Sequence, residues 1–117
     1  MTDSILRTKS KEFAKKIVFL CRELKQKGIE SSLTSQLIRS GTSIGANLHK
    51  AQYAQGTKDF ISKFEIALKE CNESEYWLEL LFEINGISRE QYEMFSKDCI
   101  ELRRMLVSSV TTLKNKL

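Results

Sequence analysis

The glycines of this chain, together with its lack of proline, constrain its fold more than any other feature. Gly28, Gly56 and Gly86 stand about thirty residues apart, and no proline interrupts the segments between them. Glycine is favoured just past a helix C-terminus, where the backbone turns left-handed, and we expect all three to occupy that position. Proline would break a helix interior, so its absence leaves each segment free to form one long helix. The chain therefore divides into four predicted helices.

Apolar residues recur with helical spacing in all four segments, which span about residues 3–27, 31–55, 57–85 and 88–117. Because the linkers are short, consecutive helices must run antiparallel. The sequence predicts an all-α fold, an antiparallel up-down-up-down four-helix bundle, and a single domain over residues 1–117. The predicted core residues are Leu6, Phe13, Ile17, Leu20, Leu24, Leu33, Leu37, Gly41, Ile44, Leu48, Ala51, Phe60, Phe64, Ala67, Cys71, Leu78, Leu81, Phe82, Tyr92, Phe95, Cys99, Leu102, Leu106, Val110 and Leu113.

The start of the fourth segment carries a local helix signal. Ser88 and Gln91 have the spacing of a capping box, in which each side chain bonds the other residue's backbone N–H. Ile87 and Tyr92 flank this turn and can pack on each other as a hydrophobic staple. We therefore expect the fourth helix to begin here.

The third segment has a second apolar patch, about 100–120° from its core stripe at 100° per residue. The patch consists of Ile66, Trp77, Leu80 and Ile84, with Glu70 and Glu73 interleaved. One interpretation is a wide core face with a few exposed apolar groups, which monomers tolerate. We favour a protein–protein contact, because a tryptophan and three aliphatic residues share one secondary face.

The stretch LIRSGTSIGANLHKA, residues 37–51, lies in the second segment but is rich in residues that weaken a helix. Its core side includes Gly41, and Ser43 and Ala46 lie opposite, beside Arg39 and Lys50. Small residues on two sides allow close approach on both, so we expect an outer neighbour. This surface and the patch on the third segment differ, so their contact would be head-to-tail and would form a ring or a fibre. The predicted oligomer-interface residues are Arg39, Ser43, Ala46, Ile66, Glu70, Glu73, Trp77, Leu80 and Ile84.

Charge is unevenly distributed along the chain, whose formal net charge is +4. The first 29 residues are strongly basic, whereas the third segment is acidic, so the two can pair or can face different partners. Five basic residues of the first segment share an arc of about 80° that contains no acid. Such a stripe can contact nucleic-acid phosphates without reading sequence, or it can be an ordinary solvated face. These candidate residues are Arg7, Lys11, Lys15, Arg22 and Lys25.

No arrangement of residues points to an enzyme, a cofactor or a metal site. The one histidine, His49, lacks the Glu-x-x-His partner of a di-iron bundle, and the three cysteines form no CxxC pair. Glu70 and Glu73 can share a proton or cation, but pairing with Arg39 or a first-segment lysine across an interface is favoured. No apolar run suits a membrane span or a signal peptide. We expect packed, reduced cysteines, a cytoplasmic location and no membrane partner.

Residues 37–81 resemble a family of small bacterial four-helix-bundle proteins first noticed as products of intervening sequences in large-subunit rRNA genes. Its pattern is similar to R-S-x-T-S-I-x-A-N-L, followed by S/T-x-x-D-F, I-A-x-K-E and E-T-x-Y-W-L. The opening ILRTKSKEFAKKIVFL also resembles the family's first helix, whereas Lys50 and Ser74 replace a usual Glu and Thr. The matching residues are Arg39, Ser40, Thr42, Ser43, Ile44, Ala46, Asn47, Leu48, Asp59, Phe60, Ile66, Ala67, Lys69, Glu70, Glu73, Tyr76, Trp77 and Leu78.

This resemblance implies a homopentamer whose molecular function is largely unassigned. A distant relative is the accessory protein of diversity-generating retroelements, a basic pentamer that associates with a reverse transcriptase and nucleic acid. Two hypotheses follow for the present chain. It is a non-enzymatic accessory factor that binds RNA or DNA weakly and without sequence preference, or it is a scaffold or adaptor that binds a protein partner.

Overall fold

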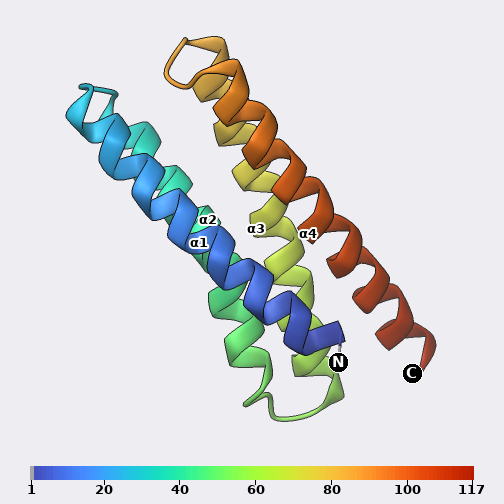
Figure 1. Ribbon diagram of the computed structural model, residues 1–117. Helices are drawn as coiled ribbons and strands as arrows, with labels where there is room; N and C mark the ends of the chain where they lie inside the picture. The colour runs from blue at the N-terminus through green and yellow to red at the C-terminus, as the bar shows by residue number, and fades with distance from the viewer. Residues whose placement is uncertain (1) are drawn as a thin grey trace.

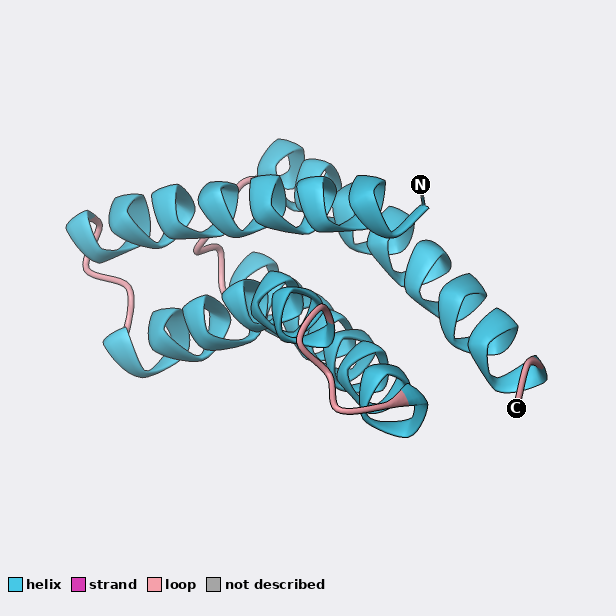
Figure 2. Ribbon diagram, turned by 90° about the horizontal axis from the view of Figure 1, so that it is seen from below, coloured by secondary structure: helices cyan, strands magenta, loops and turns pink. Residues whose placement is uncertain are grey.

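The structure, a computed structural model, describes residues 2–117, and these form four antiparallel helices (Figure 1). Helix α1 spans Thr2–Gln26, α2 Ser31–Ala51, α3 Thr57–Glu83 and α4 Arg89–Asn115. Each helix packs against the next one in the chain, and the fold is the predicted all-α four-helix bundle. The contact between α1 and α4 is the slightest of the four, and α4 diverges from α1 toward its C-terminal end (Figure 2).

The buried residues follow the apolar stripes predicted from the sequence. One continuous core cluster contains residues of all four helices, including Ile17 of α1, Ile44 of α2, Leu78 of α3 and Leu102 of α4. Five predicted core residues lie at its margin and are partly exposed. These are Leu33, Phe60, Phe82, Tyr92 and Leu113.

The three inter-helix glycines do not all occupy the predicted left-handed position after a helix: Gly56 has a positive φ but caps the start of α3, and Gly86 does not have one. Gly28 occupies this position after α1, with a φ of 80°. After α3, however, Asn85 takes the left-handed position, with a φ of 64°. Gly86 is needed for space instead, because a side chain there would place its Cβ 3.1 Å from the carbonyl oxygen of Leu81. Asparagine tolerates the left-handed region better than most residues, which explains why this position does not require glycine.

The connection between α2 and α3 is longer than predicted. Helix α2 ends at Ala51 rather than near Gln55, and Gly56 caps the start of α3 with a φ of 145°. Asp59 fixes this turn by accepting hydrogen bonds from Lys63 Nζ at 3.0 Å and from the Gln55 backbone N–H at 3.1 Å. The Lys63 hydrogen bond, supported by the one from Gln55, lowers the pKa of the Asp59 carboxyl. The acidic side chain thus stabilises a helix start whose capping residue has no side chain.

The predicted capping box at the start of α4 is present. The Gln91 backbone N–H donates to Ser88 Oγ at 3.1 Å, and the Ser88 backbone N–H donates to Gln91 Oε1 at 3.1 Å. Ile87, the expected staple residue, is buried in the core.

The glycines inside α2 allow α1 to approach closely. A Cβ on Gly41 would lie 2.9 Å from Cγ1 of Ile17, and one on Gly45 would lie 3.3 Å from Oγ of Ser10. Both glycines therefore face α1, one helical turn apart. The close neighbour that this stretch required on its inner side is α1 of the same chain.

Cys21, Cys71 and Cys99 are free and buried, as expected for packed thiols. Within residues 2–117, none of the helices contains an apolar stretch long enough to traverse a bilayer.

Candidate interaction surfaces

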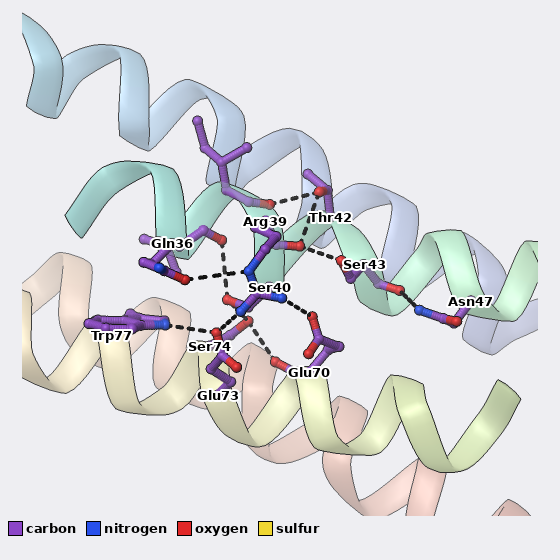
Figure 3. Close-up of polar contacts among 12 residues, drawn as sticks. Gln36, Arg39, Ser40, Thr42, Ser43, Asn47, Glu70, Glu73, Ser74 and Trp77 are labelled. Atoms are coloured by element: carbon purple, nitrogen blue, oxygen red, sulfur yellow. Dashed lines mark hydrogen bonds and ion pairs between the residues drawn. The ribbon is translucent and has the colours of Figure 1, made fainter. Parts of the chain in front are cut away.

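An arginine from α2 and two glutamates from α3 form a polar cluster on one side of the bundle (Figure 3). The Arg39 guanidinium donates to Glu70 at 2.9 Å through Nη1, and to Glu73 through Nη2. Trp77 Nε1 also donates to Glu73, at 3.1 Å. One guanidinium therefore binds two carboxylates that stand one turn apart on α3. The cluster ties α2 to α3 and orients the tryptophan.

The sequence left two partners open for the two glutamates, Arg39 or a first-segment lysine, and the structure shows pairing with Arg39. Arg39 reaches Glu70 and Glu73 within the same chain, rather than across a subunit interface. The long arginine side chain spans from the outer part of α2 to α3, which helical position alone does not reveal. The Glu70 side chain is only 14% exposed, so little of its carboxylate is available to a neighbour.

Two buried hydroxyls lie beneath this cluster. Ser74 Oγ of α3 is 3.0 Å from Ser40 Oγ of α2, and both residues are fully buried. The Leu37 carbonyl lies within hydrogen-bond distance of Ser40 Oγ, and the Glu70 carbonyl within that of Ser74 Oγ. Because each hydroxyl has one proton, one serine donates to the other and the second donates to its own carbonyl, so both hydroxyls are satisfied. Small hydroxyl residues at these positions let α2 and α3 pack closely.

The second apolar patch of α3 is only partly exposed to solvent. Ile66 is 38% and Ile84 is 45% exposed. Trp77 and Leu80 are half-buried, and Trp77 packs against the margin of the core. The wide-core interpretation therefore explains part of the patch, and the isoleucines remain as exposed apolar groups. They stand 18 residues apart, about 27 Å along the helix.

The outer side of α2 is narrow, but its hydroxyls need no neighbour. Ala46 is exposed, and Thr42 and Ser43 are half-buried. Thr42 donates to the Ile38 carbonyl and Ser43 to the Arg39 carbonyl, both one turn earlier in the same helix. Arg39 joins this side of α2 to α3, so the two surfaces that the sequence suggested as separate are continuous.

Most of the predicted basic stripe of α1 is unpaired. Among the described residues, Arg7, Lys11, Arg22 and Lys25 take part in none of the ion pairs, whereas Lys15 pairs with Glu12 at 3.0 Å. The four lysine and arginine residues from Lys11 onward are exposed, and Arg7 is half-buried.

The possible pairing of basic α1 with acidic α3 is absent from the part of the chain that the structure describes. Lys9 and Lys16, which lie off the stripe, bind Glu101 and Asp98 of α4. The carboxylates of α3 that reach other helices pair with Arg39 of α2 and with basic residues of α4. The stripe thus keeps its charge available because α3 does not face it.

Two adjoining hollows run along the stripe. The first lies between α1 and α2, and Arg7, Lys11 and His49 are among its lining residues. The second lies on α1 beside Phe19, and the two share Lys11 and Ala14. Phe19 is 63% exposed, and the sequence reasoning missed it. Its position off the core stripe of α1, among basic residues, was the available signal.

Residues 2–117 hold no cluster of three or more histidine, cysteine or acidic side chains arranged to bind a metal ion. His49 is exposed and lies beside Tyr53, with 5.6 Å between the ring centroids. Burial raises the pKa of the Cys21 thiol to about 11. A thiol with a raised pKa is a poor nucleophile at neutral pH.

Comparison with known proteins places this arrangement in a family. Residues 2–108 match the model of the 23S rRNA-intervening sequence protein family. A crystal structure of a protein of unknown function from the S23 ribosomal protein family of Bacteroides thetaiotaomicron is 46% identical, with a TM-score of 0.91. The match covers 95% of this chain and 99% of that one. No functionally curated protein matches. The chain belongs to the 23S rRNA-intervening sequence protein family.

Proposed function

We propose that this chain is a non-enzymatic, cytoplasmic helical-bundle protein that assembles into a homopentamer and binds RNA or DNA weakly, without sequence preference, through α1. The observation that carries the proposal is the row of unpaired cations on α1, Arg7, Lys11, Arg22 and Lys25. Cations that are already paired within the fold contribute less to phosphate binding, because their partners must be displaced first.

The length of the stripe suits a nucleic-acid backbone. Arg7 and Lys25 are 18 residues apart, which corresponds to about 27 Å along the helix. Each phosphate that the stripe neutralises releases counterions, so binding gains affinity at low salt without any contact to a base edge. Weak affinity and lack of sequence preference are both expected of such a surface.

Assembly is supported by the α2–α3 face. The exposed Ile66 and Ile84 of α3 offer a neighbour apolar groups, and Ala46 offers a narrow surface on α2 where α2 also borders the hollow beside α1. The number five rests on the family resemblance. In a ring, five copies of the stripe would act together, and avidity would strengthen contacts that are individually weak.

Charge reversal tests the nucleic-acid proposal. Lys11, Lys15 and Arg22 are changed together to glutamate, and binding of a labelled single strand and a duplex is followed by fluorescence anisotropy at about 50 mM salt. The matched control reverses three exposed α4 or C-terminal cations, Lys97, Arg104 and Lys116. The α1 variant should lose binding and the control should retain most of it. Equal loss in both would show that net charge, rather than the stripe, is responsible.

A second candidate function is a scaffold or adaptor for a protein partner. The exposed Ile66 and Ile84, beside the half-buried Trp77, favour it. Binding through such an apolar surface would depend little on salt, whereas phosphate binding depends on it steeply. The salt dependence of any interaction found therefore separates the two functions.

A further inference from the structure

We infer that the α1 surface is a site for single-stranded nucleic acid in particular, with Phe19 as the platform on which a base stacks. This inference rests on the proposed nucleic-acid function and adds to it a residue and a preference. The observation behind it is a large aromatic side chain, 63% exposed, beside the unpaired cations Lys11 and Arg22.

The surroundings of Phe19 combine the two elements that single-strand sites use. The Arg22 guanidinium lies 5.6 Å from the centre of the Phe19 ring, and Lys11 and Lys15 line the same hollow. Proteins that bind single strands without sequence preference pair a basic track with aromatic rings, because every base has a flat face to stack. The Arg22 guanidinium lies over one face of the ring, where it can meet the phosphate of a nucleotide whose base stacks on the other face.

The geometry favours a single strand over a duplex. The bases of a duplex are already stacked and paired, so an aromatic ring on the side of α1 meets only the sugars and phosphates of the duplex. A single strand can turn a base toward Phe19 while its backbone follows the cations. The adjoining hollow continues this path through Lys11 to Arg7.

Charge also argues against the main alternative, in which the α1 surface of one chain binds the α1 surface of a second copy. Two such stripes would bring at least four unpaired cations from each copy together. Like charges in apposition disfavour that contact. A polyanion has the complementary charge, and an exposed ring within the stripe adds a stacking surface for it.

The test measures the affinity of wild type and Phe19→Ala for a short mixed-sequence single strand and for its duplex, at several salt concentrations, by fluorescence anisotropy. Removing a base-stacking side chain should weaken single-strand binding about tenfold and leave duplex binding within about twofold. The slope of affinity against salt should not change, because the phosphate contacts remain. Phe19→Leu should lose single-strand affinity like the alanine variant, and Phe19→Trp, which keeps an aromatic ring, should retain the wild-type affinity.

Met94→Ala, which removes an exposed apolar side chain from α4, is the control and should bind like the wild type. Equal loss of single-strand and duplex binding in Phe19→Ala, or no loss at all, would overturn the stacking role while the proposed function stands. Loss of assembly in Phe19→Ala would make Phe19 an interface residue and would also overturn it. Failure of the wild type to bind either nucleic acid would overturn both.

Discussion

The close crossing of α1 and α2 makes a quantitative prediction about the two glycines of α2. In Gly41→Ala, the new methyl group would lie 2.9 Å from Cγ1 and 3.0 Å from Cγ2 of Ile17. Ile17 is fully buried, and its branched Cβ leaves few alternative rotamers, so the helices themselves must separate. In Gly45→Ala, the nearest atom is Oγ of Ser10 at 3.3 Å, which asks for a much smaller adjustment.

The expected magnitudes follow from two opposing effects. Overpacking a well-filled core costs about 1–3 kcal/mol. Replacing glycine by alanine inside a helix stabilises by about 1 kcal/mol. Gly41→Ala should therefore lower the free energy of unfolding by about 1 kcal/mol, because its contacts are the tightest. Gly45→Ala should be neutral or raise it by up to about 1 kcal/mol.

Urea unfolding followed by circular dichroism, at one fixed protein concentration, measures both variants. A double-mutant cycle of Gly41→Ala with Ile17→Ala identifies the cause, because Ile17→Ala removes both clashing carbons. The cycle should show that the two changes together cost about 2 kcal/mol less than the sum of their separate effects, because Ile17→Ala removes the overpacking and leaves the helix-propensity gain. If Gly41→Ala is as stable as Gly45→Ala, Gly41 and Ile17 do not pack as closely as a Cβ–Cγ1 separation of 2.9 Å requires.

Three further predictions concern assembly, packing and pH. Trp77→Ala should weaken each subunit contact by about 2 kcal/mol while the protein stays helical. Light scattering should then detect species approaching the 13.5 kDa monomer, and an unchanged particle size would exclude Trp77 from the interface. Ser74→Ala should cost about 1 kcal/mol of stability in urea unfolding, because Ser40 loses its buried partner across α2–α3. Since the pKa of Cys21 is about 11 in the folded protein and 9.0 ordinarily, the contribution of Cys21 to stability should be constant below about pH 9 and should fall as the pH rises toward 11. Cys21→Ala should reduce this fall, and an unchanged pH profile would contradict the burial effect.

The sequence was sufficient to predict the features that depend on local order. The apolar periodicity located the core residues, and the Ser88–Gln91 pair marked the start of α4, because both signals act within a few turns of helix. The end of α2 was missed because nothing between Ala51 and Gln55 opposes a helix. The chain leaves α2 there to begin the connection to α3, and that requirement is tertiary.

The candidate surfaces depended more on tertiary structure. Helical position placed Arg39 on the outer side of α2 but could not show that its side chain reaches Glu70 and Glu73. Nor could it show that α3 would face α2 and α4, which leaves the cations of α1 without partners. Phe19 was overlooked because a single aromatic residue off the core stripe gains meaning only once its exposure and its basic neighbours are known.

The most direct test of the proposed function is the salt dependence of binding to a short single strand. Four cations of α1 are unpaired, namely Arg7, Lys11, Arg22 and Lys25. If each contacts one phosphate, and each contact contributes about −0.7, the logarithm of the affinity should fall against the logarithm of the salt concentration with a slope of about −3. The charge-reversed variant should lose this dependence together with its binding. A wild-type slope shallower than about −1 would contradict phosphate recognition by α1.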